Sequence, residues 1–108
     1  MEERFLELVQ LMIKNRCYAL IIKNNDRNTT LVTKSELGSI PIKSQENDYQ
    51  LIRYLQYLGG LQVGYSDAQS DTFHFNVDGE IRYFNIATEG ERNHEIATLK
   101  YLGKNEGK

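Results

Sequence analysis

Two histidines and one cysteine are the side chains of this 108-residue chain best suited to metal binding or nucleophilic catalysis. His74 and His94 lie in different predicted strands, and Cys17 is far from both in the sequence. A metal site needs such ligands in a cluster, so we predict none. Cys17 sits in an apolar run, where a thiol is unreactive, and is predicted to be buried and inert.

Glycine and lysine occur together without forming a phosphate-binding loop, which needs a glycine-rich turn at the start of a helix. The Gly-Lys pairs at 103–104 and 107–108 fall in the predicted tail, and Gly59-Gly60 follows a helix. The acidic residues fall on predicted helix faces, caps and turns, where solvation or capping explains them. We therefore expect no enzymatic activity and no cofactor.

Four side chains are candidates for a binding role. Tyr49, Arg53, Gln56 and Tyr57 mix aromatic and polar character on the outer face of a predicted helix. Interfaces favour this mixture, so these residues are predicted to form part of a protein interface. The alternative is that they form an ordinary solvated face, and it stays open here.

The elements that must position these residues begin with a helix over residues 2–15, because Phe5, Leu8, Val9 and Met12 share one helical face. Residues 17–22 are continuously apolar and predict a central strand covered on both faces. A turn at 24–28 and a β-branched run at 29–33 predict a hairpin with that strand. Residues 39–42 predict an edge strand, since proline cannot donate to a strand ladder.

The second half of the chain predicts a helix and then three strands. Residues 44–47 supply capping chemistry for a helix that Gly59-Gly60 ends, followed by a polar loop over 62–71. The predicted buried stripe of this helix is Leu51, Ile52, Leu55 and Leu58.

Asp78-Gly79 marks a hairpin. Matching of apolar faces favours a three-residue loop, which pairs Phe75 with Ile81 and Phe73 with Tyr83. A charged turn at 89–92 and an alternating strand at 94–102 complete the order.

The whole pattern predicts one α+β domain over residues 1–102 and a frayed tail over 103–108. Its order is helix, strands, helix, strands, with a mainly antiparallel sheet of five or six strands and the helices toward one face. The 13 basic and 15 acidic residues give a net charge of −2, so we expect no direct nucleic-acid binding. No signal peptide or membrane-spanning run is visible, so we expect no membrane insertion and a cytoplasmic location.

Residues 51–102 contain an ordered set of motifs: LIRYLQYLGGLQVG at 51–64, a hairpin around Asp78-Gly79, and ATLKYL at 97–102. This set resembles the domain that precedes the motor in type II secretion, type IV pilus and DNA-competence traffic ATPases. The resemblance implies a PAS-like fold and a non-catalytic accessory domain whose protein partner is a motor domain or a secretion or competence scaffold.

Departures from the family limit what the resemblance implies. Family arginines that reach nucleotide correspond most closely to Ser66 and Asn85, so no nucleotide contact is carried over. No phosphate loop, Walker aspartate or histidine box is present, and ATP hydrolysis by this chain is not expected. Two alternatives stay open: a stand-alone PAS-like sensor that holds a small ligand near Phe73, Phe75, Tyr83 and Phe84, and a small phage or mobile-element interaction protein.

Overall fold

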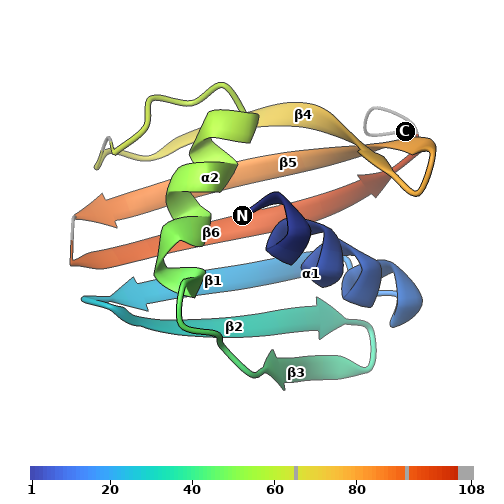
Figure 1. Ribbon diagram of the computed structural model, residues 1–108, viewed down its shortest axis with the longest axis horizontal. Coiled ribbons are helices and arrows are strands. Elements are labelled where there is room, and N and C mark those ends of the chain that lie inside the picture. The colour runs from blue at the N-terminus through green and yellow to red at the C-terminus, as the bar shows by residue number, and fades with distance from the viewer. Residues whose placement is uncertain (65, 92, 105–108) are drawn as a thin grey trace.

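A computed structural model describes residues 1–64, 66–91 and 93–104 of the chain. These residues form an α+β fold with two α-helices and a six-stranded antiparallel sheet in the order β3-β2-β1-β6-β5-β4, which confirms the predicted class (Figure 1). The elements in chain order are α1 (Glu2–Lys14), β1 (Ala19–Asn25), β2 (Asn28–Ser35), β3 (Gly38–Ile42), the 3-10 helix η1 (Asp48–Gln50), α2 (Leu51–Leu58), β4 (Gln69–Val77), β5 (Glu80–Glu91) and β6 (His94–Gly103).

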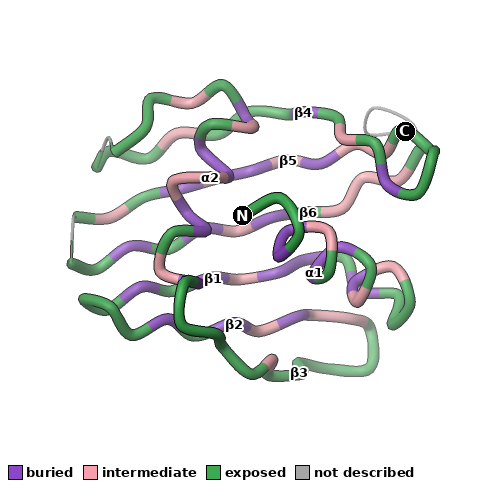
Figure 2. The backbone as a smooth tube through the Cα atoms, viewed as in Figure 1, coloured by how far each residue is buried: buried purple, intermediate pink, exposed green. Residues whose placement is uncertain are grey.

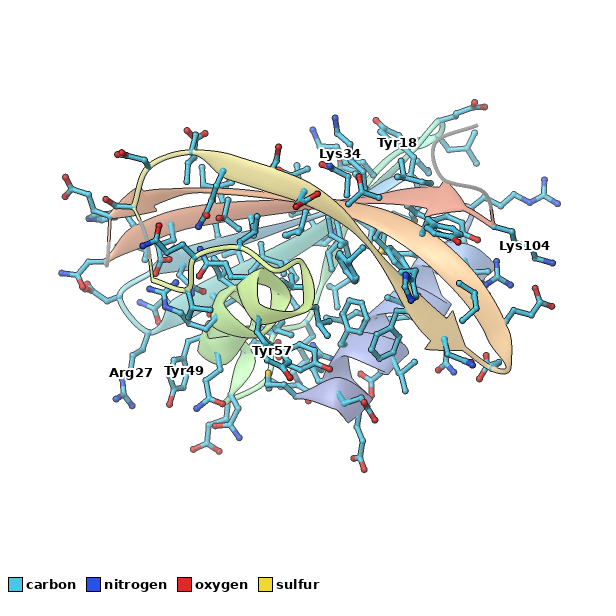
Figure 3. All side chains as sticks on the ribbon, turned by 90° about the horizontal axis from the view of Figure 1, so that it is seen from above. Tyr18, Arg27, Lys34, Tyr49, Tyr57 and Lys104 are labelled. Carbon is cyan, nitrogen blue, oxygen red and sulfur yellow. The ribbon has the colours of Figure 1, made fainter. Side chains whose placement is uncertain are left out.

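The fold has two layers, with both α-helices against the same face of the sheet (Figures 1 and 3). Burial alternates along the strands as this arrangement requires (Figure 2). In β1, Leu20 and Ile22 are buried beneath the helices, whereas Ile21 and Lys23 face the other way and are more exposed. The expectation that residues 17–22 are covered on both faces is therefore wrong. A central position in a sheet protects the edges of a strand, and only a second layer covers its other face.

The core lies between the helices and the sheet, and aromatic rings fill its centre. The ring of Phe5 on α1 lies 4.9 Å from that of Phe75 and 6.0 Å from that of Phe84, measured between centroids. Phe73 and Phe84 stack at 5.4 Å. The hairpin phenylalanines therefore contribute to packing, and Cys17 is buried beside this core, as predicted.

The β4–β5 hairpin has a two-residue turn, so the predicted three-residue loop is wrong. Asp78 and Gly79 both have positive φ, 53° and 85°, which is the conformation that Asp-Gly adopts in a tight hairpin turn. The turn fixes the register and overrides the apolar matching that the sequence pattern favoured. The observed pairs are Phe75 with Arg82 and Phe73 with Phe84, in place of Ile81 and Tyr83.

Two other predictions about the strands are confirmed. β1 and β2 pair through a tight turn at Asp26 and Arg27, and β3 with Pro41 is an edge strand.

Several predicted boundaries differ from the structure. The side chains of residues 44–47 do not cap α2, and the carboxylate of Asp48 instead accepts a 2.7 Å hydrogen bond from the backbone of Gln45. The predicted turn at 89–92 is strand as far as Glu91, with residue 92 outside the described part. Likewise, Gly103 ends β6, and most of the predicted frayed tail, residues 105–108, lies outside the described residues.

Candidate functional site

The predicted interface residues separate into two groups. Tyr49 on η1 and Arg53 on α2 line the same surface hollow, and Tyr57 lies farther along α2 with 72% of its surface exposed (Figure 3). Gln56 is only 1% exposed, so its placement on the outer face is wrong.

Gln56 can be buried because both ends of its side-chain amide are hydrogen-bonded inside the protein. Its Nε2 donates to Oγ1 of Thr88 at 3.0 Å, and its Oε1 accepts from the backbone N–H of Gly64 at 3.0 Å. A buried amide is stable only when both its ends are paired in this way. Gln56 therefore attaches the loop after α2 to β5, and it contributes no exposed surface to an interface.

The hollow has a volume of about 630 Å³ and lies where α2 begins, beside the β1–β2 turn and the start of β6. Its walls come from segments far apart in the chain, and every lining residue carries a polar or charged group. The lining residues are Asn24, Asp26, Arg27, Tyr49, Gln50, Arg53, Asn93 and Glu95.

Arg27 and Tyr49 form one wall of the hollow. The guanidinium carbon of Arg27 lies 4.9 Å from the centre of the Tyr49 ring, within the range of a cation–π contact, and the two side chains lie side by side in Figure 3. Arg27 has no hydrogen bond or ion pair with any described residue. Its N–H donors are therefore oriented by the ring and available to a partner.

Arg53 and Glu95 form another part of the lining. The two guanidinium nitrogens of Arg53 donate to the two carboxylate oxygens of Glu95 at 2.5 and 2.9 Å. Glu95 is buried and Arg53 is about one-third exposed. This bidentate pair holds Arg53 in one orientation and neutralises Glu95.

Asn24 fixes the position of Tyr49 relative to the sheet. Its Nδ2 donates to the backbone carbonyl of Tyr49 at 2.9 Å, and its Oδ1 accepts from Oγ1 of Thr29 at 2.8 Å. All three residues are at least half-buried. The aromatic wall of the hollow is thus attached to β1 and β2, which are regular strands.

The hollow presents amides, two guanidinium groups, a phenol and the carboxylates of Asp26 and Glu95. Its lining residues include no Ser, Cys or His to pair as nucleophile and base. His74 on β4 and His94 on β6 are separated by β5. In the described part of the chain, no group of three or more His, Cys, Asp or Glu residues could hold a metal ion.

No protein-family model matches this chain, and no curated protein matches it significantly. Within the described residues, no helix combines the length and apolar character needed to cross a bilayer.

Sequence reasoning missed Arg27 and Glu95. Arg27 lies within a run of turn-forming residues. Turn formation alone accounts for this run, so the sequence offered no reason to assign Arg27 a binding role. Glu95 carried a usable signal, because it shares the buried face of β6 with Ala97 and Leu99. A charge at a core position of a strand requires a partner, and Arg53 was available on the predicted helix.

Proposed function

We propose that this chain is a non-catalytic domain that binds a protein partner through the surface around the hollow, including Arg27, Tyr49, Arg53 and Tyr57. The observation that carries the proposal is the Arg27–Tyr49 contact, in which a guanidinium that has no charged partner among the described residues is held on an aromatic ring. Arginine and tyrosine are enriched among the residues that dominate interface energies. Because Arg53 and Tyr49 are already fixed by the fold, their side chains lose little conformational entropy when a partner binds.

The partner class that we propose is a motor domain or scaffold of a secretion or DNA-competence system. Support comes from the ordered motifs of residues 51–102 and from an element order compatible with a PAS-like domain. The positions that correspond most closely to the family's arginines carry Ser66 and Asn85, whose side chains have neither the charge nor the length of arginine. The Asn85 amide also donates to the Asp71 carbonyl at 3.2 Å. These differences favour a domain that accompanies a motor without touching its nucleotide.

The ligand-sensing alternative ranks below this proposal. It requires a cavity between the helices and the sheet, and the rings of Phe5, Phe75 and Phe84 occupy that space. The phage or mobile-element alternative predicts no particular residues.

Photo-crosslinking in cells that naturally express the chain tests the proposal. A benzoylphenylalanine at position 57 should trap a protein partner, whereas the same probe at the fully exposed position Leu37 should not trap that partner. Arg27→Ala in the position-57 variant should reduce the adduct about fivefold or more, because interface arginines often contribute more than 1 kcal/mol. The proposal fails if positions 57 and 37 trap the same proteins, or if Arg27→Ala leaves the adduct unchanged.

A further inference from the structure

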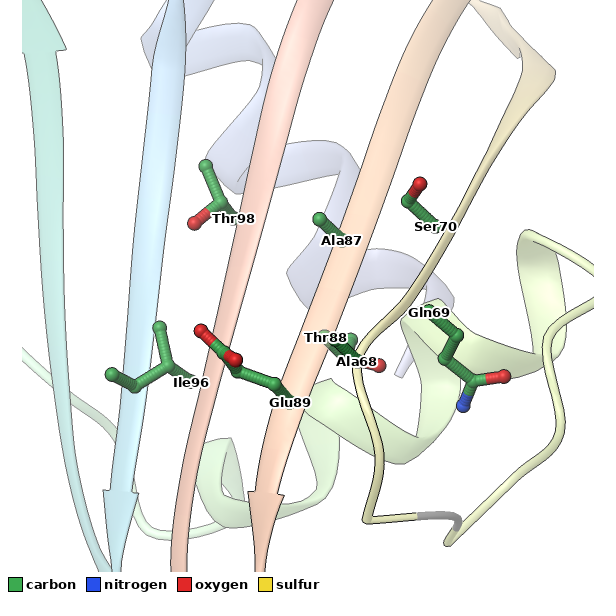
Figure 4. A pocket seen from close by; sticks show the side chains of 8 residues that line it. All are labelled: Ala68, Gln69, Ser70, Ala87, Thr88, Glu89, Ile96 and Thr98. Carbon is green, nitrogen blue, oxygen red and sulfur yellow. The ribbon is translucent and has the colours of Figure 1, made fainter.

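The face of the sheet opposite the helices carries a continuous uncharged stripe. Residues directly paired across antiparallel strands point to the same face, so the strand register traces the stripe across all six strands. It runs through Pro41, Val32, Ile21, Thr98, Ala87 and Ser70. Figure 4 shows its Thr98, Ala87 and Ser70 side chains in a row, with the helices behind the sheet.

The stripe is accessible and slightly hollowed. Its four central members are half-buried, and Pro41 and Ser70 at its ends are exposed. A shallow hollow of about 330 Å³ opens at Ala87, Ser70 and Thr98, beside Ile96, which is 40% exposed (Figure 4). Small side chains at this position allow another backbone to approach the sheet closely.

Lysines flank the stripe on both sides. Lys34 and Lys100 both pair with Ala19 in the neighbouring row, and Lys23 pairs with Ile96 in the row on the other side. None of the three forms an ion pair with a described residue. Glu89 is the acidic residue in these rows, so the flanks are net positive in a chain whose net charge is −2.

The shape and charge of this surface indicate its occupant. Five steps between strands of about 4.8 Å make the stripe about 24 Å long, which one face of a helix of about 16 residues would cover. An extended peptide would instead pair with an edge strand through its backbone, and a second copy of this chain would bring the same lysines together. Nucleic acid is disfavoured because the stripe is uncharged and carries no aromatic ring for base stacking.

We propose that the open face of the sheet binds an amphipathic helix of a second protein, about 16 residues long, whose apolar side is flanked by carboxylates. This site lies on the opposite layer from the hollow at α2, and its occupancy does not depend on the function proposed for that hollow. The helix lies across the strands, with its apolar side chains on the stripe and its carboxylates facing Lys34, Lys100 and Lys23.

Two synthetic peptides of that length test the proposal by NMR titration of the isotope-labelled chain. Both have the same leucine and alanine face, and they differ in having glutamate or lysine on its flanks. The glutamate-flanked peptide should shift the amide signals of Ile21, Thr98 and Ala87 and bind at least about tenfold more tightly than the lysine-flanked peptide. The paired substitution Lys34→Glu with Lys100→Glu should reverse this preference, whereas the change Lys14→Glu on α1, in the helix layer, should leave it intact.

A second variant tests the stripe itself. Ala87→Arg places a long charged side chain on it and should weaken binding about tenfold or more. If Ala87→Arg does not fold, the variant with Lys34→Glu and Lys100→Glu still tests the proposal. The proposal is overturned by equal binding of the two peptides, or by shifts confined to the helix side. Self-association through the same amides, or tighter binding of an oligothymidylate there, would also overturn it.

Discussion

Tyr54 on α2 is half-buried, and its ring meets the edge of Phe5 at a centroid distance of 5.9 Å. Burial raises the pKa of Tyr54, and the negative charge of Glu2 adds to this effect. At the scale of single residues, the packing of this side chain makes the stability of the fold depend on pH. The Tyr54 phenol stays neutral in the folded protein at about pH 10, where the same phenol ionises in the unfolded chain.

Tyr54→Phe should make the protein less sensitive to alkali. A raised pKa in the folded state gives stability that is complete below the unfolded pKa and is lost as pH rises through the folded pKa. Phenylalanine removes this loss, so the melting temperature of Tyr54→Phe should fall less than that of the parent between about pH 9 and about pH 11. The exposed change Tyr18→Phe should keep the parental profile. Identical profiles for Tyr54→Phe and the parent would contradict the argument.

At the scale of elements, a buried ion pair attaches α1 to the segment that leads into α2. Nε and Nη2 of Arg4 each donate to the Asp48 carboxylate at 2.9 Å, and Nη2 also donates to the Lys43 carbonyl at 3.2 Å. Asp48 is 1% exposed and Arg4 is also buried. Glu7, an exposed residue on α1, bonds the same guanidinium from the solvent side.

Asp48→Ala should lower the free energy of unfolding by about 3 to 5 kcal/mol, because it leaves the Arg4 charge buried without its partner. Glu7→Ala removes the exposed partner and should lower it by about 1 kcal/mol or less. Urea unfolding followed by circular dichroism measures both. Replacing both members, Arg4→Met with Asp48→Leu, should recover much of the loss, and equal losses for the single and double variants would count against this explanation.

Gly90 is a second constraint at the element scale, where β5 passes close to β6. Its φ is +112°, and a Cβ at this position would lie 2.2 Å from the His94 carbonyl oxygen. Gly38 also has a positive φ, +126°, but a Cβ there would have no atom within 4 Å.

Gly90→Ala should therefore destabilise the fold by clearly more than the roughly 1 kcal/mol expected when alanine adopts a positive φ. Gly38→Ala, which has the backbone strain without the clash, should stay near that value. Thermal unfolding of the two variants gives the comparison. Equal melting temperatures would show that the strands separate freely at Gly90.

At the scale of the whole molecule, one core supports two different surfaces. The two layers stack along the shortest axis, 24 Å across, so the hollow at α2 and the stripe on the open sheet belong to different layers (Figure 1). The helix side presents arginine and tyrosine, and the open side presents a slightly hollowed, uncharged stripe between lysines. If both proposed sites are used, their places on different layers would let the domain hold two partners at once.

Binding at the two surfaces should be independent. Arg27→Ala should change the affinity of the open face for the glutamate-flanked peptide by less than about twofold, since the substituted site shares no contact with the stripe. Likewise, Lys34→Glu with Lys100→Glu should leave the crosslink from position 57 unchanged. Isothermal titration and crosslinking yield measure the two effects. A loss at one surface caused by a change at the other would show that the layers are coupled.

The sequence by itself determined the features that depend on neighbouring residues. The period of Phe5, Leu8 and Met12 defined α1, the turn residues located the hairpins, and Pro41 marked an edge strand. Helix periodicity and turn chemistry are properties of short contiguous segments, which is why they can be predicted from the residues alone.

The tertiary structure alone decided which polar side chains are buried and which distant residues meet. Gln56 and Arg53 lie within one turn of α2, yet Thr88 and Gly64 bury the first, and Glu95 orients the second while leaving it partly exposed. The pairing of Arg27 with Tyr49 likewise depends on the packing of η1 against the sheet. Whether a polar group can be buried depends on a partner far away in the chain, and local sequence patterns do not specify that partner.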